Sequence, residues 1–232
     1  MKKSIQYAFK KSMPVFFGYL FLGIAFAITM CDAGFGAGWA ILSSVILYAG
    51  SLQFAMVGLL SAGTGLGTIA VMTLLINSRH MFYGLSFVEK FKKMGKQYPY
   101  MVFSLTDETY SVLCSVDQTE GSNAPKSMFW IALFDHCYWV LGTIIGTILG
   151  RTLPFDTTGI DFTMTALFVT IFIDQWRSAK THLPAVTAII SSVFYLVLLG
   201  PDHFLLPAIG TTVCILFLSR NKIQLAQVEA QS

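Results

Sequence analysis

Long uncharged, apolar stretches follow one another along nearly the whole chain. Between Asp32 and Arg79 about 46 residues carry no charge, although one membrane-spanning helix needs only roughly 20 residues. These stretches lack the polar outer face of a soluble helix, so each one predicts a membrane helix. The apolar segments are Met13–Cys31, Trp39–Leu60, Leu66–Val88, Tyr100–Val116, Ser127–Gly150, Phe162–Ile173, Pro184–Gly200 and Phe204–Ser219.

The charges between these segments constrain how often the chain crosses. Loops rich in Lys and Arg usually face the cytoplasm, so we expect the lysines at 2–11 and at 90–96 on that side. Two full crossings after the first segment would place the second lysine cluster outside. One segment is therefore expected to be broken or re-entrant, and Gly50, with Ser51 and Gln53 beside it, favours a helix break there. We predict an all-α integral membrane protein with about seven transmembrane helices, between about six and eight, one of them broken or re-entrant.

The composition agrees with this class. The chain is 55% hydrophobic and 12% charged, with a mean hydropathy of +0.67, whereas soluble domains are about 25% charged. Its polar stretches are loop-sized, which predicts one polytopic domain over residues 1–232, with a short basic cytoplasmic N-terminus (1–12) and a short C-terminal tail (220–232). No A-x-A-like cleavage site stands out, so the basic start is interpreted as leading into a retained first membrane helix. The expected location is the bacterial plasma membrane, with multiple crossings.

Several other patterns limit the chemistry. The net charge of +3 is small and scattered, which does not suggest binding to nucleic acid. The four cysteines are far apart without a C-x-x-C motif, so we expect neither disulfides, a metal site nor a cofactor. Gly142, Gly146 and Gly150 share one helix face, which predicts close approach of a second helix from this chain or from another one.

Polar side chains at membrane depth are the candidate functional residues. A charge at the centre of the hydrocarbon costs about 2.5–3.5 kcal/mol on insertion scales, so adjacent carboxylates there need water, a cation or a proton. The main candidates for substrate binding or coupling are Ser51, Gln53, Asn77, Arg79, His80, Asp107 and Glu108, and the secondary candidates are Asp135 and His136.

These candidates allow two compatible interpretations. Arg79 can pair with Asp107 or Glu108 and simply hold two helices together, or at least one of the carboxylates can act in function. The N-termini of broken helices, together with Arg79, would suit a substrate carboxylate, and Asp107 or Glu108 would suit an ammonium group. The charge complementarity therefore favours a zwitterion. A carboxylate beside a cationic partner could also carry a proton.

Four short motifs occur in an order that resembles a known family. They are Phe17-Gly18-Tyr19-x-x-x-Gly23, Tyr48-Ala49-Gly50-Ser51-x-Gln53-Phe54, Asn77-x-Arg79-His80-x-x-Tyr83-Gly84 and Thr106-Asp107-Glu108. Together they resemble the AzlC/YgaZ family, the large subunit of two-component branched-chain amino acid exporters. The resemblance covers nearly the whole chain, and the motif positions carried over are Asn77, Arg79, His80, Asp107 and Glu108. The family pattern does not fix their individual roles.

The resemblance implies a partner and a substrate class. The partner would be a small AzlD/YgaH-like membrane protein of about four helices, and the substrates would be valine, leucine, isoleucine or their analogues. It also implies export driven by the proton-motive force, and the export direction comes from the resemblance alone.

Other classes of membrane protein fit the residues less well. The chain has no Walker A motif, so it carries no site for ATP hydrolysis of that kind. An intramembrane protease would need H-E-x-x-H, a G-x-S nucleophile or paired aspartates, and only Asp107 with Asp135 offers the last. A channel or a non-transporting scaffold is the third class. We predict a secondary transporter rather than an enzyme, working by alternating access, with Asp107 or Glu108 as its proton-linked carboxylate.

Overall fold

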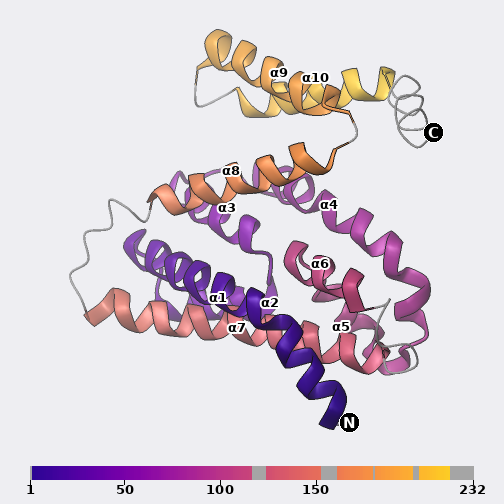
Figure 1. Ribbon diagram of the computed structural model, residues 1–232. Coiled ribbons are helices and arrows are strands. Elements are labelled where there is room, and N and C mark those ends of the chain that lie inside the picture. The colour runs from indigo at the N-terminus through magenta and orange to yellow at the C-terminus, as the bar shows by residue number, and fades with distance from the viewer. Residues whose placement is uncertain (1, 117–123, 153–160, 180, 201–203, 220–232) are drawn as a thin grey trace. The chain divides into compact units, whose positions relative to one another are not determined.

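The computed structural model describes residues 2–116, 124–152, 161–179, 181–200 and 204–219. They form helices joined by turns, with no strand among the described residues. The chain divides into two compact units, Met1–Leu167 (the N-terminal unit) and Phe168–Ser232 (the C-terminal unit). The helices are α1 (Lys2–Asp32), α2 (Ala37–Ile46), α3 (Gly50–Ser61), α4 (Leu66–Lys92), the 3-10 turn η1 (Gly95–Gln97), α5 (Tyr98–Phe103), α6 (Asp107–Val116), α7 (Ala124–Thr152), α8 (Asp161–Ser178), α9 (Leu183–Leu199) and α10 (Leu205–Leu218) (Figure 1). The predicted tail, 220–232, lies outside the described residues.

The axis of the N-terminal unit is the pair α1 and α7, which lie side by side and run in the same direction (Figure 1). Phe9 packs edge-on against Phe134 near the start of both helices, with ring centroids 5.9 Å apart. Further along, a Cβ added at Gly146 would lie 2.5 Å from the Ile24 carbonyl oxygen, and one at Gly142 would lie 2.7 Å from another carbonyl oxygen of α1. The glycine face predicted from the sequence therefore serves packing within this chain.

Length and apolarity together single out two of the described helices as able to cross a membrane: α1 over Lys3–Asp32 and α7 over Ala124–Gly150. At about 1.5 Å per residue, α1, α4 and α7 are each roughly 40 Å or longer, which exceeds a hydrocarbon core of about 30 Å. Several other apolar helices have only 10–17 residues. The predicted count of about seven crossings is therefore not confirmed by this criterion.

The segment that follows α1 is broken where the sequence predicted a break. Helix α2 ends at Ile46 and α3 begins at Gly50. Between them Tyr48 adopts a φ of 42°, in the left-handed region that non-glycine residues seldom occupy. The backbone at Tyr48 therefore turns sharply instead of continuing one helix.

The chain reverses its direction at this break. Tyr48 lies beside Tyr19, near the middle of α1, with ring centroids 6.3 Å apart. Phe54, in α3, lies beside Phe26 further along α1, at 5.8 Å. Since α2 starts just after the end of α1 and reaches the level of Tyr19, α3 must run back towards the end it came from. We call α2 and α3 the first hairpin.

The segment after α4 is broken as well, although the sequence predicted one continuous apolar stretch there. Helix α5 ends at Phe103 and α6 begins at Asp107. The Thr106 side-chain oxygen accepts the Thr109 backbone N–H at 3.3 Å, and Asp107 and Glu108 fill the first turn of α6. A helix N-terminus favours such a cap and such acidic residues. The break therefore gives both carboxylates a helix end instead of the middle of a helix.

This second break also reverses the chain. Tyr100, in α5, packs on Phe129 near the start of α7 at 5.7 Å, and Phe103 packs on His136 further along α7, also at 5.7 Å. Val116, at the end of α6, is back in the buried cluster that includes the first turns of α7. We call α5 and α6 the second hairpin.

The two hairpins enter the N-terminal unit from opposite ends. Phe87 and Phe91, near the end of α4, share a buried cluster with Ala8 at the start of α1, so α4 runs against α1. Helix α1 with the first hairpin and α4 with the second therefore form an inverted pair, whose tips meet where Tyr48 and Phe103 lie 6.2 Å apart. This arrangement brings the lysines at 2–11 and at 90–96 to the same end of the N-terminal unit. This agrees with the expectation from the sequence, because basic clusters usually face the same side of a membrane.

The C-terminal unit is built mainly on α9 and α10, which pack against each other. The hydroxyls of Tyr195 and Thr211 link the two helices at 2.9 Å. The ring of Trp176, near the end of α8, stacks on His182 with centroids 4.1 Å apart. All candidate residues named above lie in the N-terminal unit, which is the unit that carries the site.

The packing of α1 on α7 predicts a large effect from one methyl group. Gly146→Ala would place its Cβ 2.5 Å and 2.7 Å from backbone atoms of Ile24, so we expect it to destabilise the fold by about 1–3 kcal/mol. The measurement is thermal unfolding in detergent. Gly58→Ala, in α3, is the matched control, because nothing lies within 4 Å of its added Cβ. Equal melting temperatures for both variants would contradict the close packing.

Candidate functional site

The two helix breaks bring the N-termini of two short helices into the centre of the N-terminal unit. Helix α3 begins at Gly50 with Ser51 in its first turn, and α6 begins with Asp107 and Glu108. Each helix N-terminus carries a partial positive charge and backbone N–H groups without intrahelical partners. The centre of this unit therefore offers positive helix ends, hydroxyls and carboxylates within one small region.

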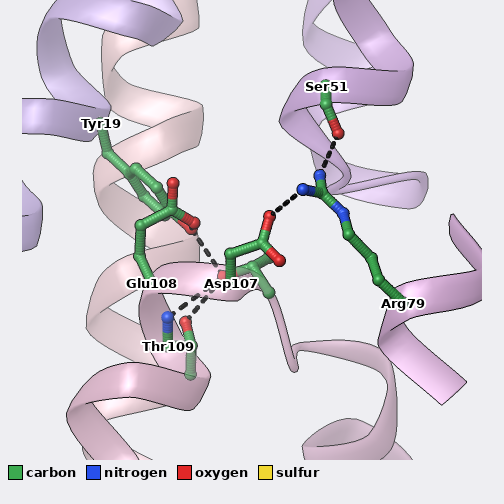
Figure 2. Close-up of polar contacts among 7 residues, drawn as sticks. Tyr19, Ser51, Arg79, Asp107, Glu108 and Thr109 are labelled. Carbon is green, nitrogen blue, oxygen red and sulfur yellow. Dashed lines mark hydrogen bonds and ion pairs between the residues drawn. The ribbon is translucent and has the colours of Figure 1, made fainter. Parts of the chain in front are cut away.

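Arg79 joins the two hairpins through what we call the arginine chain: Ser51, Arg79 and Asp107. One guanidinium nitrogen lies 2.8 Å from Asp107 Oδ2, and another donates a short hydrogen bond to the Ser51 hydroxyl. Figure 2 shows the Arg79 side chain reaching from α4 between α3 and the start of α6. The side chains of Arg79 and Asp107 are 23% and 28% exposed, so this ion pair is only partly buried.

The arginine chain has polar atoms to spare. Arg79 Nε and Asp107 Oδ1 are buried and have no hydrogen-bond partner in the described structure, and the same holds for Asn77 Oδ1, two residues before Arg79 on α4. Buried polar groups are almost always paired, with protein or with another molecule. One unused donor and two unused acceptors are the complement of a group that has both a negative and a positive end.

A second group, which we call the hydroxyl chain, links two carboxyls across the centre of the unit. It runs from Glu108 through Tyr19, Thr106 and Thr109 to Asp135. Its oxygen–oxygen distances are 2.8, 2.6, 3.0 and 2.9 Å in that order. Figure 2 shows its Glu108 end, where Tyr19 reaches from α1 towards Glu108 and Thr109 lies in the first turn of α6.

Asp135 is the most enclosed carboxyl of the site. It is 0% exposed, and Thr109 donates the one hydrogen bond that it accepts, so Oδ1 has no partner. The hydroxyl of Tyr48, which is 2% exposed, is also without a partner. The ion pairs of Arg79 and Lys92 are formed with Asp107 and Glu89, and neither involves Asp135.

Gln53 does not hydrogen-bond to the arginine chain and instead forms hydrogen bonds that hold the first hairpin. Its side-chain nitrogen donates to the hydroxyls of Ser43 and Ser44, and its oxygen accepts from Trp139 Nε1 at 3.0 Å and from the Ala49 N–H. Both donors and both lone pairs of this amide are therefore used within the protein. Gln53 holds the first hairpin closed on α7.

His136 and His80 flank the site. The His136 ring lies 4.2 Å from the Tyr48 ring, and its nitrogens contact the Tyr100 hydroxyl at 3.2 Å and the Ser44 carbonyl at 3.3 Å. His136 therefore ties both hairpins to α7. His80 directly follows Arg79 and lies 6.1 Å from the Tyr83 ring. Neither histidine belongs to the arginine chain or the hydroxyl chain.

The candidates selected from the sequence omit four residues that the structure brings into the site: Tyr19, Tyr48, Thr106 and Thr109. Tyr19 and Tyr48 fall inside apolar runs, where a tyrosine reads as a packing residue. The feature of the sequence that could have identified these two tyrosines is their position in the motifs that carry the family resemblance. The structure describes no group of three or more His, Cys, Asp and Glu side chains arranged to hold a metal ion.

Comparison with known proteins points to one family. The family model described as AzlC protein matches residues 14–153. The Branched-chain amino acid transport protein AzlC of Bacillus subtilis (strain 168) is 38% identical over 221 residues, which cover 95% of this chain and 87% of that protein.

Proteins of other organisms are similar as well. An uncharacterized membrane protein of Helicobacter pylori (strain J99) is 35% identical over 96% of this chain and 97% of its own length. Inner membrane protein YgaZ of Escherichia coli (strain K12) is 27% identical over 74% of this chain and 73% of its own length. No solved structure matches the chain. These names place the similar proteins in membranes, and that of the Bacillus protein describes transport rather than catalysis.

A double-mutant cycle should show that Arg79 and Asp107 stabilise the fold as a pair. Arg79→Gln leaves Asp107 without its cation, so we expect a loss of about 1–3 kcal/mol, of which the added Asp107→Asn recovers a large part. The measurement is unfolding in detergent. The exposed pair Lys92–Glu89 is the control, and its cycle should give less than about 1 kcal/mol of coupling. Additive effects at Arg79 and Asp107 would contradict the pairing.

Proposed function

Because this chain belongs to the AzlC family and is a multi-pass protein of the cell membrane, we propose that it is the large subunit of a secondary transporter for branched-chain amino acids. The name of its Bacillus relative supports the substrate class. The observation that carries the proposal is the arginine chain with its unused polar atoms. Its donor and acceptors complement a zwitterion, and every amino acid is one at neutral pH.

In this proposal the substrate divides the ion pair between its two ends. The α-carboxylate binds Arg79 and the N-terminus of α3 at Ser51, where the helix dipole favours an anion. The α-ammonium binds Asp107 and the side-chain oxygen of Asn77. Arg79 Nε and the two unpartnered oxygens are then satisfied. The empty site keeps its charges paired with each other, so neither is left isolated in an apolar interior.

The two hairpins supply the gates. Discontinuous helices of inverted repeats commonly surround the substrate site near the membrane midplane of transporters. We propose that α1, α4 and α7 cross the membrane fully, that both hairpins are re-entrant from opposite sides, and that the later helices complete one polytopic domain of about seven crossings. Withdrawal of one hairpin at a time would open the site to one side, which is alternating access.

The finer points of the function follow the family resemblance. We propose export of valine, leucine, isoleucine or close analogues, driven by the proton-motive force, with a small AzlD/YgaH-like membrane subunit as partner. The chain is proposed not to be an enzyme. Asp107 and Asp135, the one aspartate pair that a protease would need, take part in different chains: Asp107 binds Arg79, and Asp135 binds Thr109.

Counterflow of labelled leucine and valine in proteoliposomes tests the transport function. We expect specific, saturable counterflow from this chain reconstituted together with its small partner, and little or none from the chain alone. Saturation distinguishes a carrier from a channel. Absence of counterflow from both preparations, in protein shown to be folded, would contradict the proposed function.

A substitution in the arginine chain tests the site. Asp107→Asn removes the negative charge proposed for the substrate ammonium, so leucine affinity should fall by about 10- to 100-fold, equivalent to roughly 1.4–2.8 kcal/mol. Glu89→Gln removes a carboxylate whose side chain is 82% exposed and should leave counterflow unchanged. The readout is the leucine concentration that half-saturates counterflow. Equal values for the two variants would remove Asp107 from the substrate site.

A further inference from the structure

The proposed substrate site leaves the hydroxyl chain without a role. Its two carboxyls, Glu108 and Asp135, lie on different helices and are joined by three hydroxyl groups in an unbroken series of contacts between 2.6 and 3.0 Å. Four of its five members have exposures of 6% or less: Tyr19 4%, Thr106 6%, Thr109 0% and Asp135 0%. Glu108 is half-buried and is the end nearer to the surface.

The hydrogens available to this chain can be counted. Each hydroxyl has one hydrogen to donate, so the three hydroxyls have three hydrogens for four oxygen–oxygen contacts. If both carboxyls are ionised, Tyr19 donates to Glu108 and Thr109 donates to Asp135. The Thr106 hydrogen can then fill only one of its two contacts with hydroxyls. One contact in a buried, low-dielectric region is left without a hydrogen.

A single added proton completes the series. With Glu108 protonated, the hydrogens run Glu108 to Tyr19 to Thr106 to Thr109 to Asp135, and every contact holds one. With Asp135 protonated the same four hydrogens point the opposite way, and every contact is again filled. Every contact of the chain therefore holds a hydrogen when the two carboxyls share one proton, whereas one contact lacks a hydrogen when both carboxyls are ionised.

We propose that Glu108 and Asp135 share one proton through Tyr19, Thr106 and Thr109, and that this proton is the one exchanged for the amino acid. The inference rests on the proposed function and assigns its coupling site. Transfer from Glu108 to Asp135 moves four hydrogens by one contact each: Glu108 to Tyr19, Tyr19 to Thr106, Thr106 to Thr109, and Thr109 to Asp135 Oδ2. One O–H bond breaks and one forms at each hydroxyl. The net result is that one proton moves from Glu108 to Asp135 and the negative charge moves from Asp135 to Glu108.

The surroundings of Asp135 favour a proton over a cationic side chain as its counter-charge. Titratable groups face Asp135 from every neighbouring element: Glu108 from α6, Tyr19 from α1, Tyr48 from the first hairpin, Tyr100 from α5, and Tyr138 with its neighbour His136 from α7. None of these groups is a lysine or arginine. A lone ionised carboxylate at membrane depth costs about 2.5–3.5 kcal/mol, which a proton removes.

The hydroxyl chain and the arginine chain meet at one helix end. Asp107 and Glu108 are consecutive residues in the first turn of α6, and each begins one of the two chains. A substrate ammonium bound at Asp107 adds positive charge beside Glu108, which favours loss of the shared proton. Substrate and proton would then exclude each other, as exchange across a membrane requires.

The test separates coupling from binding. Proteoliposomes with both subunits are assayed for leucine counterflow at equal pH and for leucine movement driven by an imposed pH gradient. Asp135→Asn keeps a polar side chain beside Thr109 but cannot exchange a proton. We expect the ratio of driven movement to counterflow to fall by about tenfold, within the usual range of coupling between sites. Glu89→Gln, which changes an exposed carboxylate, should keep the wild-type ratio.

Each outcome decides something. A wild-type ratio in Asp135→Asn overturns the coupling role, as does a leucine movement that follows a sodium gradient instead of a pH gradient. Loss of counterflow and of driven movement in equal proportion, in folded protein, would make Asp135 a substrate-binding or packing residue and also overturn it. Wild-type protein that neither binds nor exchanges leucine contradicts the proposed function instead.

Two further measurements keep the proposal open to refutation if Asp135→Asn does not fold. Tyr19→Phe removes one hydroxyl from the series without changing either carboxyl, and it should lower the same ratio. In weakly buffered detergent solution, leucine should release protons from the wild-type protein and from Glu89→Gln, but not from Tyr19→Phe. Proton release by Tyr19→Phe at the wild-type level would show that the hydroxyl series is not the proton's path.

Discussion

The centre of the N-terminal unit depends on one constraint: two consecutive carboxylates must be accommodated in an apolar interior. Within a continuous helix Asp107 and Glu108 would point to different sides of an apolar segment at a cost of several kcal/mol. The helix break at Ser104–Thr106 converts their positions into the first turn of α6, where backbone N–H groups and the helix dipole favour negative charge. Arg79 and Tyr19 then provide a separate partner for each carboxylate. The second hairpin exists because these charges need a helix end.

The first hairpin contacts Arg79 from the side opposite to the second hairpin. It brings another helix N-terminus, with Ser51, to the opposite side of Arg79, so that one guanidinium is held by both hairpins. Gln53 and His136 fix the two hairpin tips to α7, with their hydrogen-bonding atoms used inside the protein. Both hairpins are therefore anchored on α7, while Arg79 and the ring contact between Tyr48 and Phe103 link the hairpins to each other. Such a contact can be exchanged for contacts with a substrate at small cost.

The sequence predicted the class of fold and many of the site residues. It did not predict the second helix break, which positions the carboxylates of the site. Hydrophobic runs predicted an all-helical membrane protein, the lysine clusters required a segment that does not cross, and Gly50 located its break. The break before Asp107 was missed because Ser104, Leu105 and Thr106 contain neither glycine nor proline. The carboxylates themselves were the signal, since acidic residues favour the start of a helix.

Sequence alone identifies the charged residues of the site but not the hydroxyl residues. A charged residue within an apolar segment is recognisable from the sequence as a candidate site residue, so Arg79, Asp107, Glu108 and Asp135 could be selected in advance. A hydroxyl becomes significant only through its neighbours in space, and Tyr19 lies 87 residues from its partner Thr106. No periodicity in the sequence reports such a contact. Hydroxyl networks in membrane helices therefore have to be read from the structure.

The positions of Asp107 and Glu108 bear on how two sites can be coupled. Coupling between distant sites requires an element with two arrangements that both sites bias. Here the shared element is a single turn of helix, in which Asp107 faces the arginine and Glu108 faces the hydroxyls (Figure 2). A movement of α6 that frees Asp107 for a substrate also changes the contact between Glu108 and Tyr19. Charge on one residue is felt by the next at close range and low dielectric. In the proposed mechanism coupling therefore needs no long path through the protein, because the substrate and the proton would act on adjacent residues of one helix turn.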